Sequence, residues 1–580
     1  MAIKRGADAV VETLREHGTE IVIGYIGHST HEIADAVGKS GLRTINPATE
    51  LGGAYMVNAY NYVKGRPAAV GIWHTVGALL LHPALQEAKS SRIPAVHLGL
   101  NGESRLHGRD GALQQVPSET FRPVTRSTER VERIDKLGEA VHRAFRVAQG
   151  VPAGPAYVDI PFDLTVDLGE IPIPPAPVAP AAGPEPRDTD VREAAAQLVA
   201  AERPVIVVGG GAVRSDAGEE IRAIAELVGV PIVTSSTGQG LISEDHPLCM
   251  GPTGLWGWSS ANATLADADF ALVIGSRLSD WGVAQGYIAR LPSKIVQVDT
   301  DPARLGEFYY PRLAIVADAR AFAAKLLAAL PETSGYVPAP FETREAVQEA
   351  LKRKHAWRQW TDEVGADNSF PMKMWRVMRA VREQLGPDDF LVADIGGHSI
   401  PVMTGAIMRK PRRLLLSFGE GVLGSAFPMG IGAKLAEPSS KVVVAAGDGG
   451  FQYHFNELRV AVAEQLPIVV IVFNNGSYGA NDWMMQSWYG KSQWSVFANP
   501  DWVALAKAYG ADGERVERAE DIEAALQRGL ASDRPYIIDV PLDPNEGFPE
   551  NGSVGPAFLI KGREIPPDLI GGLAPGENLR

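Results

Sequence analysis

Short apolar runs that end in glycine or polar residues alternate along this chain with helical stripes of apolar residues. The clearest case begins at residues 441–446, a Val-rich run that predicts a buried strand, and continues into the turn sequence GDGG at 447–450. Apolar residues then recur at helical spacing at Phe451, Phe455, Leu458 and Val462. A second buried strand at 468–473 stops at Asn474-Asn475. The pattern predicts a β-α-β unit.

This unit predicts a site at the ends of its two strands. Parallel strands joined by a right-handed crossover bring the residues that follow them to one edge of the sheet, where open α/β sheets bind ligands. We therefore expect Asp448 and Asn475 to lie side by side. A carboxylate, an amide oxygen and bare glycine backbone suit a hard divalent cation that keeps phosphate oxygens as its other ligands. The residue types predict a Mg²⁺–diphosphate site.

The same alternation over the rest of the chain predicts an α/β protein of three domains, each a parallel sheet flanked by helices. The expected domains cover residues 1–165, 189–330 and 370–545. Further strands are expected at 21–26, 42–45, 68–73, 93–98 and 156–160, at 204–208, 271–274 and 294–298, and at 390–393 and 414–417. A proline-alanine linker covers 171–186 and a charged helical linker covers 331–368. The tail at 546–580 has little periodicity, and both a lid and a loose terminus remain open.

Composition narrows the functional class. With 580 residues, 45% of them hydrophobic and 21% charged, the chain can bury several cores. A net charge of −14 argues against a general nucleic-acid binder. The single cysteine, Cys249, excludes an internal disulfide framework and fits a reducing compartment. The N-terminal stripe is interrupted by charges, unlike a signal peptide, and no apolar run is long enough to span a membrane. We expect a cytoplasmic protein.

GDG followed by NN on a strand-helix-strand resembles the cofactor motif of the thiamin diphosphate (ThDP) enzymes. The resemblance implies that Asp448, Asn475 and the backbone carbonyl of Ser477 ligate Mg²⁺. Turn glycines and neighbours at Gly447, Gly449, Gly450, Tyr478 and Gly479 would surround the diphosphate. His398 and Ser399, at a strand-to-helix turn, would also meet it, with help from the helix N-terminus.

The resemblance extends to the part of the site that activates the cofactor. The string NPATELGGAYMVNAY is similar to the family's glutamate segment, which implies that Glu50 pairs with the aminopyrimidine ring. Composition alone would leave Glu50 as one of 69 acidic residues. Leu423 lies where the family places a large apolar residue under the thiazolium, and Gly421 would offer backbone to the aminopyrimidine. Family members share these sites between subunits, so we expect a homodimer or homotetramer.

Within the family, the chain resembles the acetohydroxyacid synthase group, and its middle domain resembles that group's FAD-binding region. The matching positions are Gly209, Gly210, Gly211, Ser235, Thr237, Gly275, Ser276, Arg277, Asp299, Asp301 and Asp318. Any one of these, such as Gly-Gly-Gly after a strand, is common in Rossmann-like sheets. Together they imply bound FAD, whose role could be structural because the chemistry does not obviously need a flavin.

Three histidines distinguish this chain from the synthases. His28, His31 and His74 stand in loops where that group carries small residues. Ordinary surface or buried histidines are one interpretation. A zinc site is another, because His-x-x-His can place two ligands on one face, although a third protein ligand of the usual HExxH type is missing. The third is that they transfer protons or stabilise negative charge beside the thiazolium, together with Gln114 and Asn481.

The histidines, with SYGAN after the double asparagine, most resemble the cyclohexane-1,2-dione hydrolases. This resemblance implies ThDP-dependent hydrolytic opening of a cyclic 1,2-diketone to a 6-oxo acid. In that relative NAD can then oxidise the aldehyde product, but the sequence shows no second nucleotide site. The alternative is an acetolactate synthase-like decarboxylase or carboligase that forms acyloins from 2-oxoacids. A non-enzymatic homologue is disfavoured because Glu50, Asp448 and Asn475 are all present.

Overall fold

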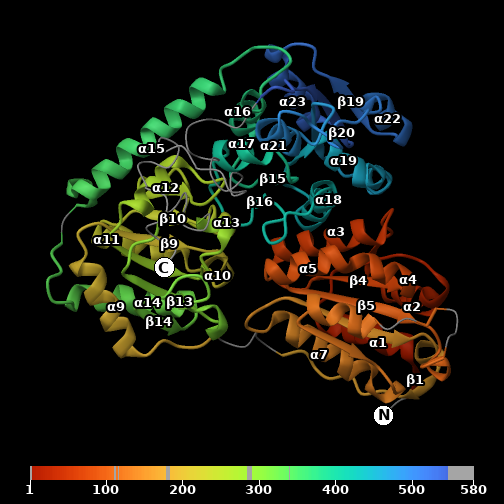
Figure 1. Cartoon of the computed structure of the whole chain (residues 1–580). Coiled ribbons are helices and arrows are strands. Elements are labelled where there is room, and N and C mark those ends of the chain that lie inside the picture. Colours follow the sequence, from red (N-terminus) through yellow and green to blue (C-terminus); the bar gives the residue numbers. More distant parts are fainter. Residues whose placement is uncertain are drawn as a thin grey trace.

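A computed structural model describes residues 3–109, 113–114, 117–177, 183–283, 290–338 and 340–546. It has three six-stranded parallel sheets, one in each expected domain, and so confirms the predicted fold class. Figure 1 shows the N-terminal domain in red and orange, the middle domain in yellow and green, and the C-terminal domain in teal and blue. The long helix α15 (Glu345–Val364) runs along the outside from the middle to the C-terminal domain, as the charged linker predicts.

The N-terminal sheet has the strand order β3-β2-β4-β5-β7-β6. Its strands are β2 (Ile21–Gly24), β3 (Arg43–Ile45), β4 (Ala69–His74), β5 (Ala95–Asn101), β6 (Ser127–Arg130) and β7 (Pro155–Pro161). One face packs on α1 (Gly6–Glu16), α2 (His31–Ser40) and α7 (Leu137–Gln149), and the other on α3 (Glu50–Lys64) and α5 (His82–Ser90). A small antiparallel pair, β1 (Ile3–Arg5) with β8 (Leu168–Glu170), closes the domain and was not predicted.

The middle sheet has the order β11-β10-β9-β12-β13-β14. Its strands are β9 (Pro204–Val208), β10 (Ile232–Thr234), β11 (Cys249–Pro252), β12 (Phe270–Ile274), β13 (Ile295–Asp299) and β14 (Leu313–Val316). Its covering helices include α9 (Asp188–Ala200), α10 (Gly210–Arg214), α11 (Gly218–Val228), α12 (Ser259–Ala266) and α14 (Ala319–Ala329). The first linker has no helix or strand in its described parts, and residues 178–182 lie outside them.

The C-terminal sheet has the order β16-β15-β17-β18-β20-β19. Its strands are β15 (Phe390–Ala393), β16 (Leu414–Leu415), β17 (Val442–Gly447), β18 (Val469–Asn474), β19 (Asp512–Arg515) and β20 (Tyr536–Pro541). Its helices include α16 (Met374–Gln384), α17 (Ser399–Gly405), α18 (Ala426–Ala436), α21 (Gly479–Tyr489), α22 (Trp502–Tyr509) and α23 (Ile522–Ala531). The predicted strand at 414–417 is shorter than expected, because the chain turns toward the loop at Gly419.

One expectation about the β-α-β unit was wrong. The helix predicted after the GDGG turn is not continuous but consists of α19 (Asp448–His454), a 3₁₀ turn at Phe455–Glu457 and α20 (Leu458–Ala463). The break places the buried Glu457 carboxylate under the loop that precedes α3, where it accepts hydrogen bonds from the N–H groups of Ala48 (2.9 Å) and Thr49 (3.0 Å). A contact between domains therefore overrides the local helical pattern.

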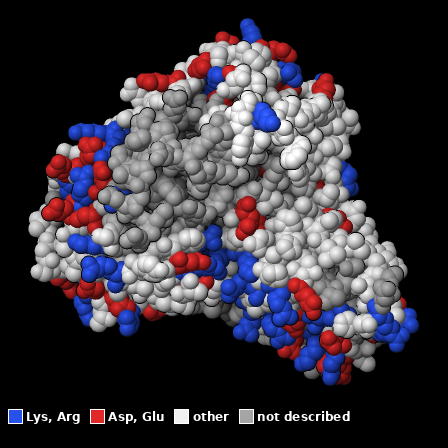
Figure 2. Space-filling model, in the orientation of Figure 1, with Lys and Arg blue, Asp and Glu red and all other residues white. Residues whose placement is uncertain are grey.

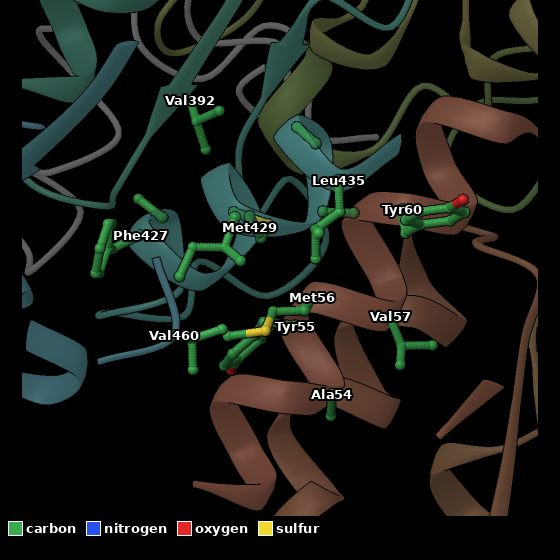
Figure 3. Packing of buried hydrophobic residues seen from close by; sticks show 14 of the residues in the cluster. Ala54, Tyr55, Met56, Val57, Tyr60, Val392, Phe427, Met429, Leu435 and Val460 are labelled. Carbon is green, nitrogen blue, oxygen red and sulfur yellow. The ribbon is translucent and has the colours of Figure 1, made fainter. Parts of the chain in front are cut away.

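The N- and C-terminal domains share a hydrophobic core. Helices α3 and α18 pack along each other, and Figure 3 shows Tyr55 and Met56 of α3 facing Met429 of α18 and Val460 of α20. Small residues permit the close approach, since a Cβ atom at Gly432 would lie 2.4 Å from the carbonyl oxygen of Met56. The packing fixes how the N-terminal domain sits on the C-terminal domain within one chain.

Candidate active site

A cavity of about 320 Å³ opens at the carboxyl ends of β15, β17 and β18. Most residues predicted for the cofactor and one predicted for the substrate line it: His398, Gly421, Leu423, Gly447, Asp448, Gly449, Gly450, Asn475, Ser477, Tyr478, Gly479 and Asn481. Ser399 does not. Its hydroxyl donates to the carbonyl oxygen of Asp394 (2.6 Å) and accepts the N–H of Gly396 (2.9 Å), so it shapes the turn that carries His398.

Four hydrogen bonds hold the carboxylate of Asp448 in place in the cavity. Its Oδ2 accepts hydrogen bonds from the N–H groups of Asn475 (3.1 Å) and Gly476 (2.6 Å) and from the side-chain amide of Asn499 (2.7 Å). Its Oδ1 accepts only the N–H of Gly449 (2.8 Å). Burial raises the pKa of Asp448 despite these donors. Asn499 was not predicted, because Asn499-Pro500 resembles an ordinary turn.

The oxygen atoms of Asp448 and Asn475 fit a metal ion whose remaining ligands come from a phosphate group. Asp448 Oδ1 keeps free acceptor capacity, and Asn475 Oδ1 accepts only the Ser477 N–H (3.1 Å). Within the described residues no group of three or more His, Cys, Asp and Glu side chains could hold a metal by itself. A cation bound here would therefore take its remaining ligands from a bound molecule or water.

His398 provides the matching feature for an anion. Its ring is buried and stacked on Phe473 with centroids 5.3 Å apart, and its Nε2 has no hydrogen-bond partner. Burial lowers the pKa of His398 to about 4, while the carbonyl groups of Asp394 and Ala445 favour the protonated ring. A buried ring nitrogen without a partner is costly. His398 lines the cavity, so an anion bound there would lie close to its ring and would favour the protonated form.

The walls of the cavity are shaped by a second buried carboxyl group, Asp394. Both of its oxygens accept the N–H of Gly424 (2.9 Å each), and burial raises its pKa to about 7. A Cβ atom at Gly450 would lie 2.1 Å from Asp394 and 3.3 Å from Leu423, so this position requires glycine. Gly421 has a φ of +66°, and a Cβ atom there would lie 3.7 Å from the ring of Trp281 in the middle domain. Apolar lining residues are Trp256, Trp281, Met374, Trp483 and Met484.

Glu50 and two of the predicted histidines lie together at the carboxyl ends of the N-terminal strands. Glu50 begins α3 and lies so close to Gly77 that a Cβ atom there would be 2.0 Å from its Oε1. His74 ends β4, and its Nδ1 is 2.7 Å from the hydroxyl of Ser29. Burial lowers the pKa of His74, and the neighbouring His28 lowers it further, while Glu50 opposes them.

The remaining predicted residues of this half lie at its edge. His31 begins α2, with its Nδ1 3.0 Å from the carbonyl oxygen of His28 and the two rings at a centroid distance of 6.4 Å. The side-chain amide of Gln114 donates to the carbonyl oxygen of Glu103 (3.1 Å), and its own oxygen is buried without a partner. Ser29, which orients His74 and donates to the carbonyl oxygen of Leu100 (2.7 Å), was not predicted, since one serine in a loop gives no pattern.

The two halves do not meet within one chain. No described residue of the N-terminal domain lines the cavity around Asp448, and Glu50 faces Gly77 of its own domain. The C-terminal half alone lacks Glu50, and the N-terminal half alone lacks Asp448 and Asn475, although the resemblance implies one site that contains all three.

A second cavity, of about 100 Å³, lies in the middle domain. Eight of the eleven predicted flavin positions line it: Gly210, Gly211, Ser235, Thr237, Gly275, Ser276, Arg277 and Asp299. Gly209 lies behind it, where a Cβ atom would be 2.3 Å from the carbonyl oxygen of Gly275. Asp301 instead forms an ion pair with Arg92 (3.0 Å), and Asp318 caps α14 by accepting the N–H of Arg320 (2.9 Å).

Positive charge gathers around this second cavity. Arg92, Arg214 and Arg304 line it together with Arg277, and burial lowers the pKa of Arg214 to about 10. Figure 2 shows Lys and Arg side chains along the junction between the middle and N-terminal domains. Arginines, hydroxyl groups and glycine backbone fit a phosphate-bearing ligand.

Family models for thiamine pyrophosphate (ThDP) enzymes match all three domains. The N-terminal TPP binding domain matches residues 4–120, the central domain 191–326 and the C-terminal TPP binding domain 394–540. The chain belongs to the thiamine pyrophosphate enzymes. The "Acetolactate synthase large subunit" of Corynebacterium glutamicum is 31% identical over 92% of this chain and 86% of its own length. The "Probable acetolactate synthase large subunit" of Methanocaldococcus jannaschii is 29% identical over 94% and 93%.

As a thiamine pyrophosphate enzyme, the protein is close to the acetolactate synthase large subunits. The "Acetolactate synthase isozyme 1 large subunit" of Escherichia coli is 28% identical over 93% of this chain and 94% of its own length. These relatives are named synthases, so they do not support the expected likeness to cyclohexane-1,2-dione hydrolase. No described helix has the length and apolar character needed to cross a membrane.

Proposed function

We propose that the protein uses ThDP and Mg²⁺ to break or form a carbon–carbon bond next to a carbonyl group. The observation that carries the proposal is the convergence of Asp448, Asn475 and the buried His398 ring on one cavity in a chain of this family. When bound, ThDP supplies a nucleophilic carbon that adds to carbonyl groups. Asp448, Asn475 and the Ser477 carbonyl would hold the metal, His398 and the glycine backbone the diphosphate, and Leu423 and Gly421 the two rings.

The first candidate activity is the decarboxylation of a 2-oxoacid and its joining to a second carbonyl compound, as in an acetolactate synthase. The names of the relatives favour it. In this candidate the middle-domain cavity holds FAD, with the arginines around it neutralising the diphosphate. The names of the relatives do not mention NAD, which is therefore not part of the proposal.

The second candidate is hydrolytic opening of a cyclic 1,2-diketone, and the histidines favour it. His74 lies close enough to both His28 and Glu50 to feel their charges, and burial lowers the pKa of His74, which favours the neutral ring. A neutral imidazole can accept a proton from water while a neighbouring donor stabilises the charge that develops on a carbonyl oxygen. Asn481 would supply such a donor from the opposite half of the site.

Turnover of two substrates distinguishes the candidates. Purified protein with ThDP and Mg²⁺ is offered pyruvate or cyclohexane-1,2-dione, and the products are identified. Acetolactate from pyruvate supports the first candidate, and 6-oxohexanoate from the dione supports the second. Loss of both activities on chelation and dialysis, with recovery after both cofactors are added back, supports the cofactor assignment. Full activity in the stripped protein would exclude it.

A double substitution tests the role of the histidines. Losing a donor that stabilises developing negative charge costs about 2.7–4 kcal/mol of transition-state stabilisation. We therefore expect His28→Ala with Asn481→Ala to depress ring opening far more than ThDP binding, while carboligation of pyruvate, which needs no water, is kept. The measurement is the ratio of the two activities in wild type and variant. A parallel fall of both would show that these residues only maintain the fold or the cofactor.

A further inference from the structure

Glu546 stands between the cofactor cavity and a second, outer cavity. The outer cavity has a volume of about 560 Å³ and is lined by Trp360, Glu363, Val364, Asp367, Lys373, Trp375 and Asn545. Glu363, Asp367 and Asn545 are exposed, so solvent reaches this cavity. Glu546 is the one described residue that lines both cavities.

The carboxyl group of Glu546 is positioned by a hydrogen bond but is not locked in an ion pair among the described residues. Its Oε2 accepts the N–H of Met374 at 2.7 Å. The nearest cation, Lys373, is engaged by Asp543, with Nζ and Oδ2 2.5 Å apart. Burial raises the pKa of Glu546 to about 7, Lys373 and the Met374 N–H oppose the rise, and Asp543 and Asp367 add to it. The group can therefore be either protonated or charged near neutral pH.

The other acidic groups in the cofactor cavity are poorly suited to exchanging protons. Asp448 accepts four hydrogen bonds, and Asp543 is held in its ion pair with Lys373. The reaction under either candidate function must also deliver a proton. In ring opening, the electron pair left by carbon–carbon cleavage takes up a proton at carbon. In carboligation, that electron pair adds to the second carbonyl, and the alkoxide so formed takes up the proton.

We propose that Glu546 carries protons between the outer cavity and the cofactor cavity during turnover. The protonated carboxyl gives its proton to the reacting molecule, directly or through one water, as the new C–H or O–H bond forms. The carboxylate left behind takes a proton from water of the outer cavity, so that each turnover returns Glu546 to its starting state. This inference rests on the proposed ThDP chemistry, and it holds for both candidate substrates.

Three variants test this role of Glu546. Glu546→Gln keeps the shape of the side chain but cannot titrate, and Glu546→Asp keeps a carboxyl group. Glu363→Gln is the control, because Glu363 lines only the outer cavity. We expect Glu546→Gln to lower kcat by about 100-fold, at the lower end of the usual effect of a positioned acid. The fall in kcat above about pH 7, where wild-type Glu546 loses its proton, should disappear. ThDP affinity, measured by fluorescence titration, should stay the same. Glu546→Asp should recover part of the rate, and Glu363→Gln all of it.

A second readout needs neither substrate nor cofactor. Infrared difference spectroscopy of the cofactor-free protein should show a carboxyl band that titrates near pH 7, is present in wild type and is missing in Glu546→Gln, once the contributions of Asp394 and Glu244, which titrate in the same range in both proteins, are subtracted. Absence of that band, an unchanged pH profile in Glu546→Gln, or a loss of ThDP affinity in step with kcat would each overturn the inference. A protein that binds ThDP but turns over neither substrate would instead count against the proposed function, and the infrared result would still decide the role of Glu546.

Discussion

At the scale of single residues, the candidate site is organised before any ligand binds. Three N–H donors hold one oxygen of Asp448 and leave the other facing the cavity with spare acceptor capacity. Arranging these dipoles during folding removes the cost of reorganising them when a metal arrives. His398 shows the opposite case, because its Nε2 is buried without a hydrogen-bond partner and this costs stability.

Replacing Asp448 by Asn should abolish high-affinity ThDP binding while leaving the fold intact. The amide keeps one acceptor for the surrounding N–H groups but removes the negative charge that a divalent cation needs. We expect affinity for ThDP with Mg²⁺ to fall by at least about 100-fold, beyond the usual effect of changing a residue that only supports a ligand. Isothermal titration calorimetry measures it.

The matched control is Asp501→Asn, at the N-terminus of α22. Asp501 caps that helix by accepting the N–H of Ala504 (2.9 Å), and asparagine caps as well as aspartate. This variant should bind ThDP as wild type does. Equal losses in both variants would mean that the effect at Asp448 is one of general stability.

At the scale of elements, the sequence predicts the longer, purely apolar strands best. The edge strands β3 and β16 were also predicted, whereas the inner strand β10 has three residues, β20 is interrupted by Asp539, and both were missed. The predicted strands at 204–208 and 390–393 match β9 and β15, because central parallel strands are continuous apolar runs. The edge strands β6 (STER) and β19 (DGER) are polar and were missed. These two strands bury little, so their formation depends on a neighbouring strand rather than on their own residues.

The same distinction applies to the candidate site. Asp448 and Asn475 could be paired from the sequence because one crossover fixes their positions. Asn499 and Glu457 could not, since Asn499 reaches Asp448 from a distant loop and Glu457 acts on another domain. The sequence resemblance identified Glu50, but only the structure shows Ser29 holding His74 beside it.

The packing of α3 on α18 gives a prediction about stability. A methyl group at Gly432 would meet the backbone of Met56 at 2.4 Å, and backbone cannot move aside as a flexible side chain can. We expect Gly432→Ala to destabilise the protein by about 1–3 kcal/mol, the usual cost of overpacking. Differential scanning fluorimetry should show a lower unfolding temperature.

Gly38 in α2 provides the control, because a Cβ atom there would meet nothing within 4 Å. Gly38→Ala should raise the unfolding temperature, since alanine favours a helix by about 1 kcal/mol over glycine. A rise of the same size for Gly432→Ala would mean that α3 and α18 do not pack as closely as described.

At the scale of the whole molecule, the chain divides its candidate catalytic groups between two places. Glu50, His28 and His74 lie on the N-terminal domain, and Asp448, Asn475 and Asn481 line a cavity that this domain does not reach. Large hydrophobic side chains stay exposed near both halves: Ile26, Val76 and Leu80 near the first, and Tyr453, Trp494 and Val496 near the second. Such surfaces are typical of protein interfaces. We infer that a second copy of the chain covers them and completes each site.

Subunit mixing tests this arrangement. Glu50→Gln and Asp448→Ala should each be inactive alone, because each removes one half of every site. In a mixed dimer, one site combines two damaged halves and the other combines two intact ones. If subunits exchange at random, half of the dimers are mixed and each has one intact site of two, so about a quarter of wild-type activity should return. Native mass spectrometry measures the exchange, and each variant incubated alone is the control. Inactivity after complete exchange would mean that Glu50 and Asp448 act within one chain, and that the interface has another role.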